Sequence, residues 1–270
     1  MTHNNHVPAG VRDEFPELSG LVPDVPMDFA SRVLRRVGVD PGRYDTYAEA
    51  ETAAGPLWVT ASPTAITGAA LVAAWPASAA FEAEHRRRTG RSAVATLRVA
   101  KGVLPALRSG RARQLTIELA GLTADERAVL EAVRTVPPKQ LRPLAWVARE
   151  SGLGPDETRF VAEVLARNPL TVLVPTHRIT GDTGEPCDVG YPAGAGEALR
   201  RAEGIEPSDV AELLESGTRF LGSDTTRIFC HPTCSDARRI TVAHRVPFGS
   251  AREARQAGYR ECMRCRPVAA

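Results

Sequence analysis

Two short cysteine pairs decide the organisation of this 270-residue chain: Ile228-Phe-Cys-His-Pro-Thr-Cys234 and Glu261-Cys-Met-Arg-Cys-Arg-Pro267. Three residues separate the first two cysteines, two separate the last two, and 27 lie between the pairs. Four thiols in two close pairs can converge on one tetrahedral Zn²⁺ ion, and Pro232 favours a tight turn within the first pair. The spacing therefore predicts a zinc site formed by Cys230, Cys234, Cys262 and Cys265.

Two other interpretations of the four cysteines are a purely structural zinc knuckle and a pair of disulfides. We find no secretory signal and therefore expect a reducing cytoplasmic location, associated with the nucleoid, in which thiols stay free. No apolar run approaches the length of a transmembrane helix, so we expect no membrane partner. Disulfides are thus disfavoured, and the structural knuckle stays open as the alternative to a reactive site.

Charge is distributed unevenly along the chain. Residues 218–270 contain ten arginines and four acidic residues, a net charge of +6, which leaves −4 for residues 1–217 because the whole chain carries +2. A small basic module on an acidic body suggests a polyanionic partner, and we favour double-stranded DNA over a merely soluble surface. The candidate phosphate contacts beside the cysteines are Arg227, Arg238, Arg239 and Arg245.

The wider stretch around the cysteines resembles a known family. Arg219-Phe-Leu-Gly-Ser-Asp-Thr-Thr-Arg-Ile-Phe-Cys230, Arg245-Val-Pro-Phe-Gly-Ser250 and Ala257-Gly-Tyr-Arg-Glu-Cys262 closely resemble the zinc domain of the Ada methyl-response proteins, over about 218–267. The resemblance implies that Cys230 is both a zinc ligand and the acceptor of a methyl group from a DNA methylphosphotriester. A thiolate is the nucleophilic form of cysteine, and zinc keeps it deprotonated.

The residues before the zinc module are predicted to form a β-rich half over 26–121. Residues 1–25 read as a flexible leader, in which His3 and His6 are solvated. A helix begins at Asp28 as a possible cap and ends at Gly38. Strands follow within 44–75, interrupted by a turn at Ser62-Pro63, then a basic helix over 81–91 and a strand over 113–119. Nine basic residues between 82 and 113 form either a second DNA-facing stripe or a solvated surface.

Residues 122–204 are predicted to be helical. Thr123-Ala-Asp-Glu126 has the form of a capping box, and short helices over 144–150 and 155–167 suggest a helix-turn-helix. Here Asn168-Pro-Leu-Thr-Val-Leu-Val-Pro-Thr-His-Arg-Ile179, Gly190-Tyr191 and Glu203-Gly204 resemble the alkylguanine-DNA alkyltransferases. The resemblance implies an α+β fold with the β-rich half in front, a DNA-binding helix-turn-helix, and Arg159 and Asn168 near DNA.

The chain departs from that family where its chemistry is carried out. The family's Pro-Cys-His-Arg is Pro175-Thr-His-Arg178 here, so the alkyl-accepting cysteine is Thr176. A threonine hydroxyl is far less acidic than a thiol, and we expect the surviving His177 and Glu203 to be a vestigial network. The aligned helix-turn-helix positions carry Leu144, where the family has tyrosine, and Phe160 and Ala162, where it has small residues, while Glu163 adds a negative charge that would face phosphates. Cys187 is the fifth cysteine, either a relocated acceptor or, more simply, a bystander.

Together these features predict a monomer with an alkyltransferase-like module, a linker at 205–217 with one capped helix, and an Ada-type zinc domain at 218–270. The expected reaction is single-turnover methyl transfer from a DNA methylphosphotriester to Cys230. The rival hypotheses are a non-enzymatic protein that binds alkylated DNA, a methylation-responsive transcription regulator, and a structural zinc protein. The sequence leaves open which of these functions the first module has.

Overall fold

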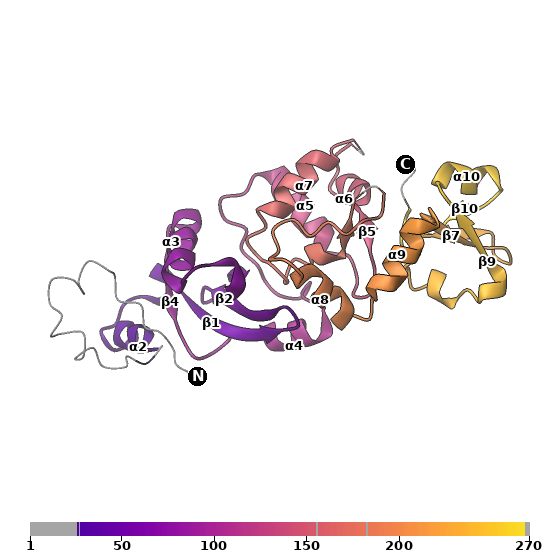
Figure 1. Ribbon diagram of the computed structural model, residues 1–270. Helices are drawn as coiled ribbons and strands as arrows, with labels where there is room; N and C mark the ends of the chain where they lie inside the picture. Colours follow the sequence, from indigo (N-terminus) through magenta and orange to yellow (C-terminus); the bar gives the residue numbers. More distant parts are fainter. Residues whose placement is uncertain (1–25, 27, 155, 182, 268–270) are drawn as a thin grey trace.

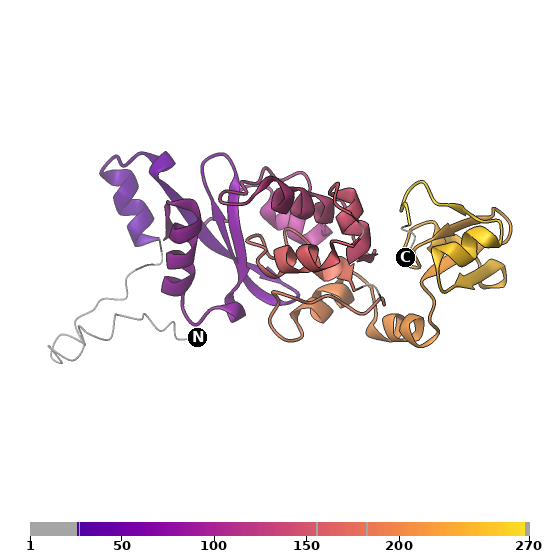
Figure 2. The ribbon, with the colours of Figure 1, turned by 90° about the horizontal axis from the view of Figure 1, so that it is seen from above.

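The computed structural model describes residues 26, 28–154, 156–181 and 183–267. Its fold is α+β, as predicted, and its three parts follow one another in a row: a β-rich part, a helical part and a small cysteine-containing part (Figures 1 and 2). The expected leader with His3 and His6 lies outside the described residues. Among the described residues, the structure contains no helix long and apolar enough to cross a membrane.

The β-rich part is a four-stranded sheet of order β3-β2-β1-β4, in which β4 alone runs parallel to its neighbour. The predicted turn at Ser62-Pro63 is confirmed, because the Ser62 hydroxyl accepts hydrogen bonds from the N–H groups of Thr64 and Ala65. The elements of this part are α2 (Phe29–Arg36), η2 (Pro41–Arg43), β1 (Tyr44–Thr52), β2 (Gly55–Ala61), β3 (Ile66–Leu71), η3 (Val72–Ala74), α3 (Ser78–Thr89), β4 (Ser92–Ala95) and α4 (Val103–Ser109).

Alternation along β2 assigns its side chains to two cores. Trp58 faces α3, where it packs with Tyr47 and Phe81, whose ring lies 5.1 Å from the Trp58 ring. Leu57 and Val59 face the other way and join the main core, which continues into the helical part. The β-rich and helical parts therefore share one hydrophobic core.

Three local predictions in the β-rich part need correction. The first helix exists, but Asp28 makes no side-chain cap and instead pairs with Arg32 across 3.8 Å. The expected strand over 113–119 is wrong. Only Ile117 pairs with the sheet, through one isolated bridge to Ile66 in β3, because the rest of the segment does not run along the edge of the sheet. The basic helix begins at Ser78, earlier than the arginines that suggested it.

The helical part builds on the capping box predicted at Thr123, whose hydroxyl accepts from the Glu126 N–H while the Glu126 carboxylate accepts from the Thr123 N–H. The helix-turn-helix is formed by α6 and α7, and the second helix begins three residues later than expected. The elements are α5 (Ala124–Arg134), β5 (Arg142–Pro143), α6 (Leu144–Glu150), α7 (Thr158–Ala166), η4 (Thr176–Arg178), β6 (Ile179–Thr180) and α8 (Ala195–Ala202).

The last part is a second four-stranded sheet of order β10-β8-β7-β9 around Phe220, Phe229, Phe248 and Tyr259. Gly222 is required there, because a Cβ atom would lie 2.7 Å from the rings of Phe248 and Tyr259. The linker helix lacks the predicted side-chain cap, since Glu206 makes none. The elements are α9 (Pro207–Glu215), β7 (Phe220–Ser223), β8 (Ile228–Cys230), η5 (Ala237–Arg239), η6 (Val242–His244), β9 (Arg245–Phe248), α10 (Ala251–Gln256) and β10 (Arg260–Glu261).

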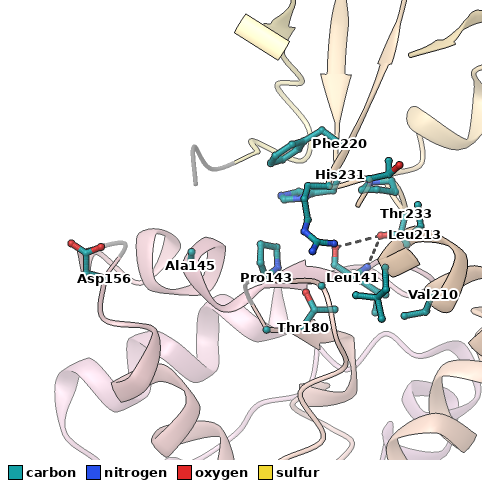
Figure 3. A pocket seen from close by; sticks show the side chains of 16 residues that line it. Leu141, Pro143, Ala145, Asp156, Thr180, Val210, Leu213, Phe220, His231 and Thr233 are labelled. Atoms are coloured by element: carbon teal, nitrogen blue, oxygen red, sulfur yellow. Dashed lines mark hydrogen bonds between the residues drawn. The ribbon is translucent and has the colours of Figure 1, made fainter. Parts of the chain in front are cut away.

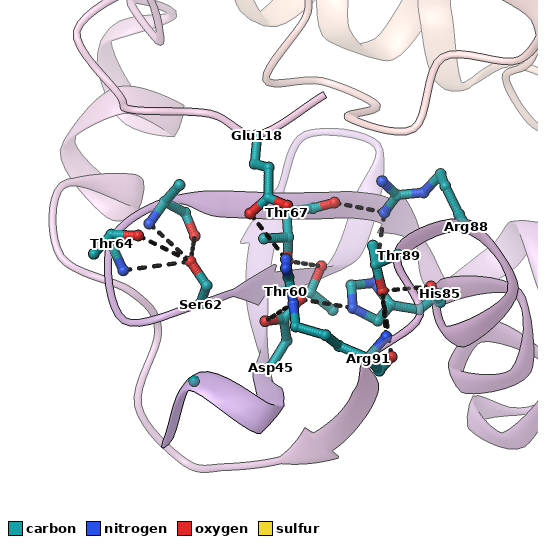
Figure 4. A network of polar contacts seen from close by, with 12 residues as sticks. Asp45, Thr60, Ser62, Thr64, Thr67, His85, Arg88, Thr89, Arg91 and Glu118 are labelled. Atoms are coloured by element: carbon teal, nitrogen blue, oxygen red, sulfur yellow. Dashed lines mark hydrogen bonds and ion pairs between the residues drawn. The ribbon is translucent and has the colours of Figure 1, made fainter. Parts of the chain in front are cut away.

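A buried polar network ties α3 to the first sheet (Figure 4). Asp45 is fully buried and accepts hydrogen bonds from His85 Nε2 at 2.8 Å and from Arg91 Nε at 3.0 Å. Burial alone would raise the pKa of Asp45, but the hydrogen bonds from His85, Thr67 and Arg91 lower it below its ordinary value. Arg91 also pairs with Glu118, so this part of the predicted basic stripe is engaged inside the fold.

Replacing Asp45 with Asn should therefore destabilise the protein by about 3 kcal/mol or more, because it removes one charge from a buried group of paired charges. Chemical denaturation measures this loss. Glu84→Gln on α3 is the matched control: it breaks the more exposed Arg87–Glu84 pair and should cost no more than about 1 kcal/mol. Equal effects of the two substitutions would contradict the role given to Asp45.

Candidate metal centre and alkyltransferase-like site

The four predicted cysteine ligands come together in the last part of the fold. Their sulfur atoms all lie within 4.8 Å of one another, and none of the four residues is more than 4% exposed. Parallel pairing of β8 with β10 places Phe229 opposite Glu261. The next residues, Cys230 and Cys262, therefore lie side by side at the same end of the two strands. We refer to Cys230, Cys234, Cys262 and Cys265 as the four-cysteine centre.

Each pair is held by a local turn. The Cys234 N–H donates to the carbonyl of His231 at 2.9 Å, and the Arg266 N–H donates to the carbonyl of Cys262 at the same distance. The Cys262 thiol lies 3.6 Å from a carboxylate oxygen of Asp236. Asp236 is in turn paired with Arg264. The two turns and the contact with Asp236 therefore orient the thiols toward one another.

The protonation of the centre fits a bound cation. Hydrogen bonding with Cys234 and Cys265, together with burial, raises the pKa of Cys230 far above its ordinary value. Hydrogen bonding with Cys230 and Cys265 lowers the pKa of Cys234, and backbone hydrogen bonds at Asp236 and Ala237 add to that effect. The opposite shifts of these two neighbouring thiols show that ionisation of one opposes ionisation of the other. A dication among the four sulfurs would let all of them bind as thiolates.

The four candidate phosphate-contacting arginines are all exposed but differ in their contacts. Arg227, Arg239 and Arg245 are exposed, and the Arg227 guanidinium lies 5.1 Å from the centre of the Tyr259 ring. Arg245 Nε donates to the carbonyl of Ile240. Arg238 is also exposed, but its guanidinium donates to the carbonyl of Lys139 in the helical part at 2.8 Å, so it is engaged between the two parts.

The second site lies around Thr176, which is 2% exposed. The adjacent His177 is equally buried and has both ring nitrogens engaged: Nδ1 lies 3.2 Å from the Tyr191 hydroxyl and Nε2 lies 3.2 Å from Glu203 Oε1. Burial lowers the pKa of His177, and burial raises the pKa of Tyr191 to about 12. A neutral imidazole that donates to Glu203 and accepts from Tyr191 satisfies this arrangement.

Glu203 is the anionic end of the same network. It accepts from Arg178 Nε at 3.1 Å and from the Lys139 N–H at 2.9 Å. Burial would raise its pKa, but the hydrogen bonds from His177 and Arg178 and the charge of Arg178 bring the pKa of Glu203 down to about 2. Sequence reasoning found His177 and Glu203 but missed Arg178 and Tyr191, although both belong to the motifs that carry the resemblance.

The remaining predicted residues of the first module divide between surface and core. Arg159 projects from α7 with 93% of its side chain exposed and pairs with Glu163. Asn168 is engaged inside its own loop, because its amide donates to Val174 and accepts from Leu170. Leu144 and Phe160 are partly buried against the main core. Ala162, on the same helix as Phe160, is half-buried.

Cys187 belongs to neither group of predicted site residues. It is half-buried, its N–H donates to the carbonyl of Ile179, and burial raises the pKa of its thiol. A raised pKa leaves less of the reactive thiolate at neutral pH. Its surroundings therefore favour the bystander interpretation over a relocated acceptor.

Comparison with known families now adds to this geometry. Residues 124–205 match the family described as 6-O-methylguanine DNA methyltransferase, DNA binding domain, and residues 215–268 match the metal binding domain of Ada. The chain joins a methylguanine-methyltransferase DNA-binding domain to an Ada metal-binding domain. The cofactor is Zn²⁺, which suits both this Ada domain and its four clustered thiols.

Individual relatives cover parts of the chain. A methylated-DNA–protein-cysteine methyltransferase of Mycobacterium leprae is 31% identical over 89 residues, which are 33% of this chain and 52% of the relative. The chain thus spans about half the length of that relative. Among solved structures, the O6-methylguanine methyltransferase of Mycobacterium tuberculosis is 19% identical with a TM-score of 0.47, over 63% of this chain and 99% of that one. The Mycobacterium tuberculosis OGT in complex with DNA is 21% identical with a TM-score of 0.47, over 61% and 97%.

The Glu203 network predicts a specific pH dependence of stability in the methyltransferase-like domain. A folded pKa of about 2, below the ordinary 4.5, gives stability that is present above pH 4.5 and is lost as the pH falls toward 2. Glu203→Gln should therefore cost about 3 kcal/mol at pH 7, and the difference from wild type should shrink over that window. Denaturation at several pH values measures it.

The control for this experiment is Glu197→Gln, which removes a half-exposed pair with Arg201 on the neighbouring α8. It should cost about 1 kcal/mol or less. A Glu203→Gln deficit that does not change between pH 6 and pH 2 would contradict the charge-based role of Glu203.

Proposed function

We propose that this protein is a single-use acceptor that takes a methyl group from a DNA methylphosphotriester onto Cys230. The observation that carries the proposal is the convergence of four buried thiols within 4.8 Å of one another, in a domain that matches the metal-binding domain of Ada. Cys230, Cys234, Cys262 and Cys265 would hold the ion, and Cys230 would also react.

Bound zinc would keep all four thiols ionised at neutral pH, which supplies the nucleophile. The sulfur of Cys230 then forms a bond to the methyl carbon, and the bond between that carbon and the phosphate oxygen breaks. The electron pair stays on the oxygen, so the neutral triester leaves as an ordinary phosphodiester anion. The product thioether carries no charge, and the net charge of the loaded centre changes from −2 to −1.

Charge also selects the substrate. A centre of net charge −2 repels an ordinary phosphodiester, whereas a methylated phosphotriester is neutral and can approach. The exposed Arg227, Arg239 and Arg245 would bind the flanking phosphates that stay anionic. Arg238 is a poorer candidate while it donates to Lys139. After transfer the repulsion is smaller, so DNA affinity should rise.

We further propose that the first module does not transfer alkyl groups from guanine. Thr176 is buried, and the nitrogen atoms of the neighbouring His177 are already hydrogen-bonded to Tyr191 and Glu203. His177 is therefore not free to take the proton of the Thr176 hydroxyl, which is itself a weak acid. The network is better suited to hold the loop between α7 and β6.

A specific observation also favours DNA binding by this module. Arg159 is almost fully exposed on α7 of the helix-turn-helix, within the segment that matches a DNA-binding domain. The rival function is therefore recognition of alkylated bases without chemistry. If methylation of the protein increases its binding to a promoter, the protein is a transcription regulator.

The deciding experiment is mass spectrometry of the intact zinc-loaded protein after incubation with a duplex that carries one methylphosphotriester. We expect a gain of one methyl per chain, located on the Cys230 peptide. The gain should persist in Cys187→Ser and disappear in Cys230→Ser. A duplex with O6-methylguanine should give no methylated peptide.

A protein that binds zinc but takes up no methyl group would contradict the proposal. A methyl group on the Cys187 peptide would instead show that the first module reacts. If the Cys230→Ser protein binds the O6-methylguanine duplex more tightly than an unmodified one, the first module recognises lesions without reacting with them.

A further inference from the structure

The two modules contact each other directly beside the four-cysteine centre. The Leu141 N–H donates to Thr233 Oγ1 at 2.7 Å, and the Trp146 indole N–H donates to the carbonyl of Cys265 at 2.9 Å. Arg149 adds hydrogen bonds to the carbonyls of Arg266 and Pro267. We call these contacts the docking interface. They attach β5 and α6 of the first module to the two cysteine turns of the second.

The docking interface is incompletely packed. A cavity of about 440 Å³ lies beside it. Figure 3 shows Leu141, Pro143 and Thr180 on one side of this cavity, Phe220 and His231 on the other, and the hydrogen bonds between Leu141 and Thr233 at its edge. Contacts between domains that are small and partly polar open more readily than a continuous core. The polar contacts and the cavity are the features expected of an interface that can open.

Arg142 is a buried cation at this interface whose hydrogen-bond acceptors carry no charge. It is 2% exposed, and its guanidinium donates to the carbonyl of Leu141 and to the amide oxygen of Gln140, which are both neutral. It lies 5.7 Å from the centre of the Trp146 ring, and its Nε has no hydrogen-bond partner. Within the part of the chain that the structure describes, no carboxylate forms an ion pair with it.

A buried cation without a counter-charge is strongly unfavourable. Burial lowers the pKa of Arg142, and the opposing effect comes from Cys265, Cys234, Cys262 and Cys230 of the other module. The geometry agrees, because Arg142 lies against the Trp146 ring and the Trp146 indole N–H donates to the carbonyl of Cys265. The anionic group beside this arginine is therefore the four-cysteine centre. With zinc bound, four thiolates give that centre a net charge of −2.

We propose that Arg142 is the counter-ion of the four-cysteine centre and that it couples the docking of the two modules to the charge of that centre. In the reduced, zinc-loaded protein the attraction between Arg142 and the thiolates holds the interface closed. This coupling rests on the proposed function in one respect: methylation of Cys230 removes one negative charge, so it weakens the attraction and loosens the interface. The first module would then respond to chemistry that occurs in the second.

The Trp146 indole N–H reports docking directly, because its acceptor belongs to the other module. The chain has three tryptophans, so three indole signals appear in a ¹H–¹⁵N spectrum, and Trp146→Phe assigns this one. In the zinc-loaded protein, Arg142→Met should accelerate hydrogen exchange of this N–H by at least about tenfold. The same substitution should weaken zinc binding by about 10- to 100-fold in a chelator competition.

Arg134→Met is the matched control, since Arg134 is an arginine of the same module that is only 6% exposed and binds backbone carbonyls away from the interface. It should leave both the Trp146 exchange rate and the zinc affinity unchanged. Arg142→Lys keeps the charge and should recover part of both.

Two further samples vary the charge of the centre. Methylated wild type, with uptake verified by mass, and zinc-loaded Cys230→Ser each lack one thiolate, and both should show accelerated Trp146 exchange. The serine variant tests the coupling even if no methyl group is ever transferred, so failure of the proposed reaction is distinguishable from failure of the coupling. An exchange rate that is the same in wild type, Cys230→Ser and Arg142→Met, with zinc bound in each, would overturn the proposal.

Discussion

Four buried thiols in mutual contact impose the constraint on which this structure depends. Their sulfur atoms lie within 4.8 Å of one another, and like charges at that separation cannot form together without a cation. The second sheet, the two turns and the hydrogen bonds around Cys234 all serve to hold these sulfurs in place. Zinc at this centre would leave it with a net charge of −2, and in the proposed function that charge would decide which phosphate can approach and how strongly the centre attracts Arg142.

A nucleophile must lose its proton before it can accept a methyl group, and the two modules differ in whether they provide for that step. In the second module a bound cation would supply it for Cys230. In the first module Thr176 has no such help, because its neighbour His177 is bound on both sides by Tyr191 and Glu203. The first module keeps a stable core, an exposed Arg159 on its helix-turn-helix and a contact with the zinc centre. In the proposed function it would act as a DNA-binding partner of the second module and not as a second acceptor.

Features with a compact sequence signal were predictable, and contacts without such a signal were not. Thr123 and Glu126, three residues apart, predicted a capping box that is present. Two close cysteine pairs predicted their own convergence across the 27 residues between them, because one tetrahedral metal site takes four ligands. The strand expected over 113–119 had the right alternation, but the sheet offered it only one bridging residue. Arg142 carried no signal at all, since its role depends on Cys230 and Cys265, which lie about ninety residues or more further along the chain. A buried arginine between two apolar residues gives no indication of its counter-charge until the fold is known.

The proposed chemistry requires that all four cysteines, Cys230 included, bind one zinc ion as thiolates. Zinc X-ray absorption on the loaded protein tests this requirement, because sulfur and nitrogen ligands lie at different distances from the metal. We expect four sulfur neighbours at about 2.3 Å. Three sulfurs with one nitrogen at about 2.0–2.1 Å, as binding by His231 in place of Cys230 would give, would contradict it.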